Sequence, residues 1–182
     1  MEKLDMMIDL KNYIQMAEQL DDNEKNRRLL HYFPWMEPLD WYGHKVKVID
    51  MIESGEIWTA WNDFPLGWRK AFGWEMLKEL DQVIREDKLE SFGIEQIKEK
   101  FGGLRFYCAG GNRKIHDIIS KYEELSYKTC IECGKPAEWI SKGWISPWCG
   151  ECKEKLEKEG CEFYSLEACL EKAEEIKSGS DF

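Results

Sequence analysis

Two pairs of cysteines are the residues whose type and spacing most clearly indicate chemistry. Cys130 and Cys133 are separated by two residues, as are Cys149 and Cys152, and fifteen residues lie between the pairs. Two residues between thiols allow one tight turn to direct both sulfurs toward the same point. Four thiolates then complete the tetrahedral shell that Zn²⁺ accepts. The spacing therefore predicts one Zn²⁺ ion bound by these four cysteines.

The residues between the pairs indicate how the pairs meet. The segments AEWI and WISP flank Ser141-Lys142-Gly143, which is typical of a hairpin turn. A hairpin would bring the two pairs together, as in a zinc ribbon. Four unrelated buried thiols would seldom show this spacing by chance. A redox-active dithiol is also disfavoured, because nothing near the two cysteine pairs resembles a thioredoxin-type unit. We expect a zinc ribbon over residues 129–160.

A shell of four thiolates leaves no open position for water or substrate, so this metal is expected to be structural and not a Lewis acid. Lys135, Lys142 and Lys153 lie close in sequence to the ligands. These lysines would either offset the formal charge of −2 that Zn²⁺ and four thiolates carry together, or be ordinary surface lysines.

The other three cysteines give weaker indications. Cys108 and Cys169 fall on apolar faces and are interpreted as packing residues. Cys161 is ambiguous, and a structural role is favoured.

No group of catalytic residues can be recognised elsewhere in the sequence. The three histidines, His31, His44 and His116, form no spaced cluster, and most acidic residues alternate with lysines as on solvated helix faces. Gly102-Gly103 lacks the lysine of a phosphate-binding loop and is interpreted as a hairpin turn. The sequence therefore predicts a protein that is not an enzyme.

The elements expected to position the cysteines follow from hydrophobic periodicity. They are a helix over residues 4–20, an irregular aromatic loop over 29–43, a strand over 45–52, a helix over 67–87, a hairpin over 93–112, a helix capped by Asn112, and a helix over 166–176. The expected fold is α+β, with helices packed on a small antiparallel sheet and the zinc ribbon near the C-terminus. The expected domains are residues 1–128, the ribbon at 129–160, and a helix with a loose tail at 161–182.

Composition and charge restrict the class of protein. Nine tryptophans and 43% hydrophobic residues indicate a folded chain, and no apolar run has the length of a signal peptide core or a membrane span. A cytoplasmic location is expected, where cysteines are thiols or metal ligands. The net charge of −10 argues against general affinity for phosphate backbones.

The basic residues are unevenly distributed. Residues 101–128 carry five basic and three acidic side chains, between two acidic ends. An alternative interpretation is therefore a nucleic-acid-binding patch formed by Lys98, Lys100, Arg105, Tyr107, Arg113 and Lys114. Ordinary solvated surface is favoured over this patch, because acidic residues lie in the same stretch.

Three segments carry a resemblance: IKEKFGGLRFY, SYKTCIECGKPA and GWISPWC. Through them the chain resembles a family of small proteins carried by phages and gut bacteria. Its length and layout are also similar to a phage-type anti-CRISPR family. This resemblance implies a non-enzymatic protein that binds a type II RNA-guided DNA nuclease, or its guide-RNA complex, in the host cytoplasm and hinders target-DNA binding or cleavage. The positively charged channel of such a nuclease would suit an acidic partner. The resemblance assigns no role to single residues.

Overall fold

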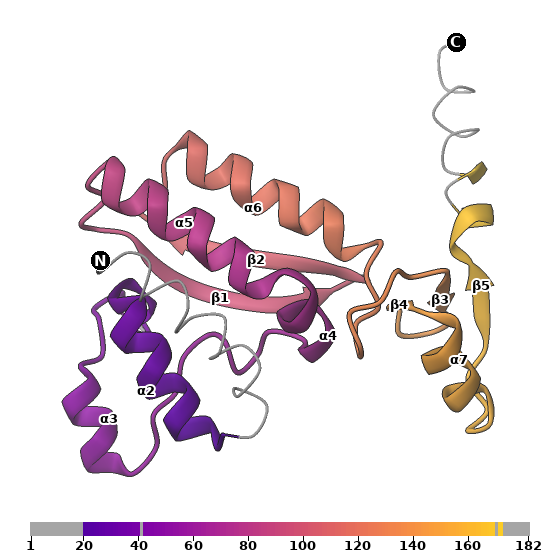
Figure 1. The fold of residues 1–182 in the computed structure, drawn as a ribbon, viewed down its shortest axis with the longest axis horizontal. Coiled ribbons are helices and arrows are strands. Elements are labelled where there is room, and N and C mark those ends of the chain that lie inside the picture. Colours follow the sequence, from indigo (N-terminus) through magenta and orange to yellow (C-terminus); the bar gives the residue numbers. More distant parts are fainter. Residues whose placement is uncertain (1–19, 41, 170, 173–182) are drawn as a thin grey trace, which may run out of the picture.

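The computed structural model describes residues 20–40, 42–169 and 171–172 and shows an α+β fold (Figure 1). The helices are α2 (Asp22–Tyr32), η2 (Pro34–Met36), α3 (Val48–Ser54), α4 (Leu66–Trp68), the π-helix η3 (Arg69–Gly73), α5 (Trp74–Glu86), α6 (Arg113–Ser126) and α7 (Gly150–Glu157). The strands are β1 (Gly93–Lys100), β2 (Gly103–Ala109), β3 (Trp139–Ser141), β4 (Pro147–Trp148) and β5 (Phe163–Ser165).

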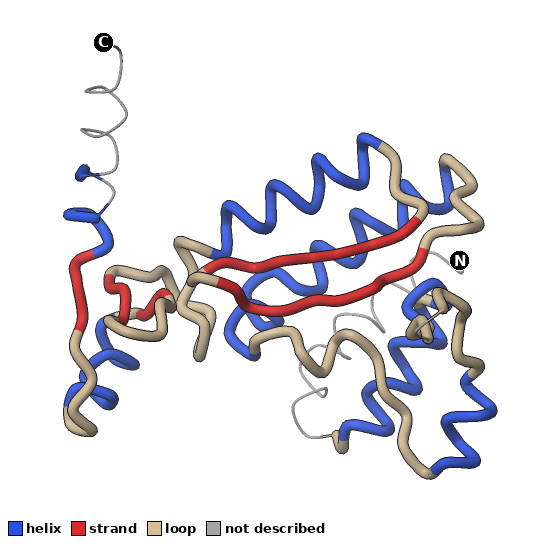
Figure 2. The backbone as a smooth tube through the Cα atoms, turned by 180° about the vertical axis from the view of Figure 1, so that it is seen from behind, coloured by secondary structure: helices blue, strands red, loops and turns tan. Residues whose placement is uncertain are grey.

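The centre of the fold is the antiparallel hairpin β1–β2, with α5 and α6 packed on one of its faces. Ile97 lies opposite Phe106 in the hairpin, and both are buried together with Leu104. Figure 1 shows α5 and α6 alongside the hairpin, and Figure 2 shows the two strands from behind. Along β2 the side chains alternate: Leu104 and Phe106 are buried on one face, whereas Arg105 and Tyr107 lie on the other. On the opposite face of the hairpin Lys100 and Tyr107 are exposed, and Lys98 and Arg105 are half-buried.

The hairpin turn lies one residue earlier than predicted. Phe101 and Gly102 both have positive φ, 54° and 78°, as the central residues of a type I′ turn do. Gly103 begins β2 instead, and it is needed for a different reason. A Cβ on Gly103 would lie 2.6 Å from Tyr127 Oη and 2.7 Å from Tyr127 Cε1, so the absent side chain makes room for this ring.

We predict that Gly103→Ala displaces the Tyr127 ring and lowers the free energy of unfolding by about 1–3 kcal/mol, the usual cost of overpacking. Denaturant unfolding measures this cost. In a Tyr127→Ala background the same change should cost much less, because the obstructing ring is gone. An equal cost in both backgrounds would contradict the steric explanation.

The helix α6 and the chain from 66 to 86 agree with the sequence analysis. Asn112 caps α6, its side chain accepting a hydrogen bond from Ile115 N at 3.1 Å. The predicted helix over 67–87 is observed as α4, η3 and α5 without a break, although its π-helical turn was not predicted.

The N-terminal half differs from the prediction in three places. Residues 29–32, expected in an irregular loop over 29–43, form the end of α2. The predicted strand over 45–52 is wrong, because Val48–Ser54 forms α3. The alternation is short, and Gly55 at φ 84° ends a helix at this point. Residues 21–26, which directly follow the helix predicted over 4–20, begin α2, and Asp21 caps its first turn by accepting a hydrogen bond from Glu24 N at 3.0 Å.

Parts of the predicted termini are outside the described residues. This applies to residues 4–19 of the N-terminal helix and to residues 170 and 173–176 of the C-terminal one, whereas residues 166–169 and 171–172 are helical. Of the helices in the described ranges, none combines the length and apolar character that crossing a bilayer requires.

Candidate metal centre

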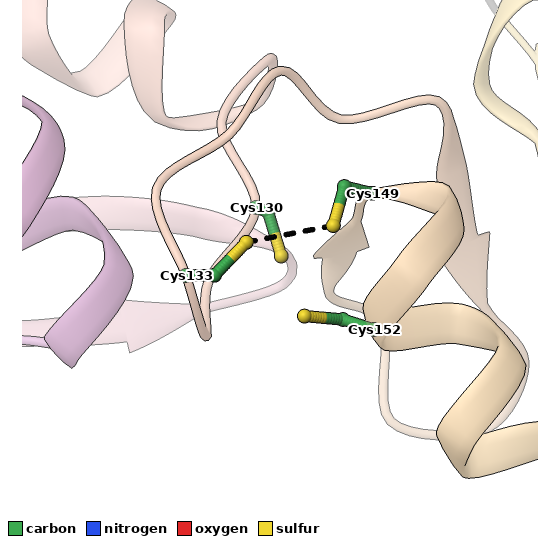
Figure 3. Close-up of side chains that lie close together, drawn as sticks. All are labelled: Cys130, Cys133, Cys149 and Cys152. Atoms are coloured by element: carbon green, nitrogen blue, oxygen red, sulfur yellow. Dashed lines mark hydrogen bonds between the residues drawn. The ribbon is translucent and has the colours of Figure 1, made fainter.

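The structure brings the four predicted cysteines together. The Sγ atoms of Cys130, Cys133, Cys149 and Cys152 all lie within 4.8 Å of one another and converge on one point (Figure 3). The Sγ atoms of Cys133 and Cys149 are 3.4 Å apart, too far for a disulfide bond of about 2.05 Å. Tetrahedral zinc with bonds of about 2.3 Å places its sulfurs about 3.8 Å apart. The cluster thus has the donor set and dimensions that fit one metal ion.

The first pair is held by a tight turn. Gly134 has φ 82°, and its N–H donates to Cys130 O at 3.0 Å, closing the turn that directs both thiols inward. Ile131 N donates to Pro147 O at 3.0 Å, which ties this turn to β4 just before the second pair.

The second pair lies at the start of a helix that the sequence analysis did not predict. Cys149 is the N-cap of α7, and Cys152 lies within the first turn of that helix. The hairpin between the pairs is confirmed as β3–β4, which a third strand, β5, extends through pairing with β3. The metal module therefore consists of a turn, a three-stranded sheet and a helix.

Burial and mutual interaction set the protonation of the thiols. Cys130, Cys149 and Cys152 are buried, and Cys133 is half-buried. Burial raises the pKa of Cys130, but the backbone N–H groups of Cys133, Cys149 and Glu132 more than offset this, so its pKa is lowered. Burial and the neighbouring thiols raise the pKa of Cys152. Metal binding has to displace protons from such a cluster, so affinity falls as pH falls.

The first pair docks directly on the helical body. Gly67 N in α4 donates to Ile131 O at 2.8 Å, and the fully buried Trp68 donates from Nε1 to Thr129 O at 2.9 Å. A Cβ on Gly67 would overlap Cys130 O and lie 2.6 Å from the Ile131 carbonyl, whereas a Cβ on Gly134 would lie 2.6 Å from Gly67 O. Two backbones meet here without intervening side chains.

The three lysines near the ligands form ordinary side-chain pairs. Lys135 binds Glu151 at 2.7 Å, Lys142 binds Glu162 at 2.9 Å, and Lys153 binds Glu157 at 2.7 Å. The pKa of Lys135 is raised mainly by Glu151, with smaller contributions from Cys133 and Cys149. The Lys135–Glu151 pair therefore joins the chain just after the first cysteine pair to a residue between the two cysteines of the second.

The remaining cysteines lie outside the cluster. Cys108 and Cys169 are half-buried and Cys161 is exposed. Cys108 packs against the main core, and burial raises the pKa of its thiol.

The six residues of the predicted basic patch separate into two groups. Lys98, Lys100, Arg105 and Tyr107 share the face of the hairpin that is opposite to α5 and α6. Arg113 and Lys114 lie at the N-terminus of α6, beyond the other end of the hairpin, where they approach Asp117 at 3.9 Å and Asp87 at 2.8 Å. The single patch of six residues is therefore not formed.

Sequence reasoning missed two aromatic residues beside the first group. Tyr127 packs over Gly103, and its Oη accepts a hydrogen bond from Arg105 at 2.8 Å. Trp144, from the loop after β3, donates from Nε1 to Glu99 Oε2 at 3.0 Å. The two glycines at the hairpin tip were the available signal for close approach by another segment.

No protein-family model, curated protein or solved structure matches this chain.

Proposed function

We propose that the chain is a non-enzymatic binding protein in which one zinc ion, bound in a ribbon-like module, has a structural role. The convergence of four cysteine Sγ atoms within 4.8 Å carries this proposal. Four thiolates fill the shell of Zn²⁺, so the ion would stabilise the chain and present no site for substrate.

The positions of the histidines also support a binding role. His44 is exposed and its Nδ1 lies 3.4 Å from Asp40 Oδ2, whereas His31 lies in the last turn of α2 and His116 lies in α6. These side chains come from separate elements of the described chain. Such dispersal does not provide the paired base and nucleophile that hydrolysis without an open metal site needs.

For the partner, we propose a type II CRISPR effector nuclease or its guide-RNA complex. Support comes from the resemblance of the KEKFGGLRFY and cysteine segments and from the net charge of −10. An acidic protein is steered toward the basic channel of such an enzyme, while exposed aromatic residues such as Trp144 can provide specific contacts.

We predict that the purified protein forms a stable complex with the nuclease and reduces its cleavage of target DNA. Size-exclusion chromatography and a cleavage assay measure the two effects. The control is Cys161→Ser, which changes an exposed thiol outside the cluster and should inhibit as the natural chain does. Normal cleavage at saturating protein would rule out this partner.

A second candidate, a nucleic-acid-binding module, is favoured by the grouping of Lys98, Lys100, Arg105 and Tyr107 on one face of β1–β2.

A further inference from the structure

The face of the hairpin opposite to α5 and α6 carries cations that lie on aromatic rings. We call this face, with Lys98, Lys100, Arg105, Tyr107 and Tyr127, the open face. Lys98 Nζ lies 5.7 Å from the Tyr107 ring centre, and Arg105 Cζ lies 5.9 Å from that of Tyr127. Lys100 Nζ lies 5.4 Å from the ring centre of Phe101 at the tip. Each of these three cations therefore lies close to an aromatic ring.

The cations of the open face are available to a ligand. Lys98 and Arg105 stand directly opposite each other, an arrangement of like charges that destabilises a hairpin. No carboxylate of the described residues forms an ion pair with Lys98, Lys100 or Arg105, whereas Lys114 is bound to Asp87. Arg105 donates to Tyr127 Oη and Leu104 O, and the negative charge of Glu123 also acts on it. An anion on this face would relieve the repulsion between Lys98 and Arg105.

Phe101 occupies a conformation that favours another residue type. It has φ 54° and is 70% exposed, so neither its backbone nor burial explains a phenylalanine at the tip. Left-handed backbone costs an L-residue about 1–2 kcal/mol, and Asn or Gly is the usual choice in this turn. A costly, exposed aromatic side chain indicates a contact made outside the chain.

The metal module places another exposed aromatic ring, Trp144, at the hairpin tip. Glu99 accepts hydrogen bonds from Gly102 N at 2.7 Å and from Trp144 Nε1 at 3.0 Å, so one carboxylate fixes Trp144 beside the hairpin tip. The Trp144 side chain nevertheless remains 77% exposed. A Cβ on Gly102 would lie 3.0 Å from Ile145 Cγ2, which shows how closely the two loops meet.

We propose that the open face, with Phe101 and Trp144, binds a single-stranded nucleic acid. Exposed rings stack on unpaired bases, while the cations between them pair with phosphates; this combination is typical of single-strand-binding surfaces. A duplex hides the faces of its bases and would leave the rings without partners. The inference rests on the proposal of a binding function, but it does not require the nuclease as partner.

Titration of the full-length zinc-loaded protein with a labelled 12-nucleotide single strand tests the proposal. At low salt we expect both single-stranded DNA and RNA to bind at least tenfold more tightly than a duplex of the same sequence. The tighter of the two single strands identifies the natural type of ligand. Three phosphate contacts predict that log K falls with log salt concentration with a slope of about −2.

Phe101→Gly separates a binding role from a structural one. Glycine accepts positive φ without strain, so the variant should be at least as stable as the natural chain in thermal unfolding. Its affinity for the single strand should nevertheless fall about 5- to 100-fold, the effect of losing one stacked base. A Tyr107→Ala variant should show a similar loss of affinity.

Lys98→Ala and Arg113→Ala form a matched pair, since each removes one positive charge. Lys98→Ala should weaken binding and reduce the magnitude of the salt slope by about 0.7, whereas Arg113→Ala, away from the open face, should leave the slope unchanged. Equal effects of the two variants, unchanged affinity of Phe101→Gly, or tighter binding of the duplex would overturn the proposal. Absence of single-strand binding at low salt would also overturn the proposal. If the protein nevertheless inhibited the nuclease, the proposed function would remain supported without this further inference.

Discussion

Replacing Cys130 with Ser is expected to abolish stoichiometric zinc binding and to unfold the metal module. Cys130 is the fully buried member of the first cysteine pair, and a serine hydroxyl is a poor substitute for a thiolate ligand. Structural zinc contributes about 10–16 kcal/mol to the folding of small zinc peptides. We expect this chain, which has a separate core, to lose about 4 kcal/mol or more of unfolding free energy. For a chain of this size such a loss lowers Tm by about 8–16 °C.

Metal analysis and thermal unfolding measure these two effects. Cys161→Ser is the matched control, because it changes an exposed cysteine outside the cluster and should leave both zinc content and Tm unaltered. A Cys130→Ser protein with one zinc ion per chain, or natural protein without metal, would contradict the assignment of the centre.

Gly67→Ala is expected to separate the metal module from the helical body while leaving the four cysteines intact. The new methyl group would overlap Cys130 O, and backbone atoms cannot rotate away as a flexible side chain can. The hydrogen bonds from Gly67 N to Ile131 O and from Trp68 Nε1 to Thr129 O would both be lost or lengthened. We expect a loss of about 3 kcal/mol of unfolding free energy, at the upper end of overpacking costs.

Gly150→Ala is the control for this prediction. Gly150 lies between the second pair of ligands, but a Cβ there has open space, with Glu138 Oε2 at 4.0 Å as its nearest neighbour. Its stability should change little, since alanine also favours the helix α7. Hydrogen exchange at the backbone N–H of residue 67 and at the Trp68 indole N–H, the two donors of this contact, should increase in Gly67→Ala alone. Equal protection in both variants would show that the two parts do not depend on this contact.

The cysteine site could be predicted from sequence because its constraint is local. Two residues between thiols and a hairpin between the pairs suffice to predict that Cys130 and Cys149 converge. The helix α7 could not be predicted in the same way, because GECKEKLE has no clear apolar stripe and its stability depends on the Cys152 ligand and on packing. Local spacing thus predicts the donor set, while tertiary contacts determine the elements that carry it.

The grouping of the basic residues could not be predicted from sequence, because it depends on contacts between distant segments. A patch of six residues looks continuous in the sequence, but β2 ends before Arg113, and the turn at Gly110 places Arg113 and Lys114 beyond the far end of the hairpin. Conversely, Tyr127 and Trp144 approach the tip from segments 24 and 41 residues after Gly103. Contacts of this kind depend on how helices and loops fold back, which periodicity does not reveal. The strand predicted over 45–52 is wrong for a different reason: the alternation of lysine and valine ends at Val48, where α3 begins.

The backbone-to-backbone contact between Gly67 and residues 130–134 has a consequence for recognising related chains. Ile131 joins Gly67 and Pro147 through main-chain atoms, so these hydrogen bonds do not depend on its side chain, and other apolar residues that pack on the core should be tolerated at this position. Substitutions of Gly67 or Gly134 should not be tolerated, since any larger side chain would prevent the two backbones from approaching each other. A Gly-Trp dipeptide some sixty residues before Cys-x-x-Cys-Gly should therefore outlast most of the surrounding sequence and serve as a signature for distant descendants of this architecture.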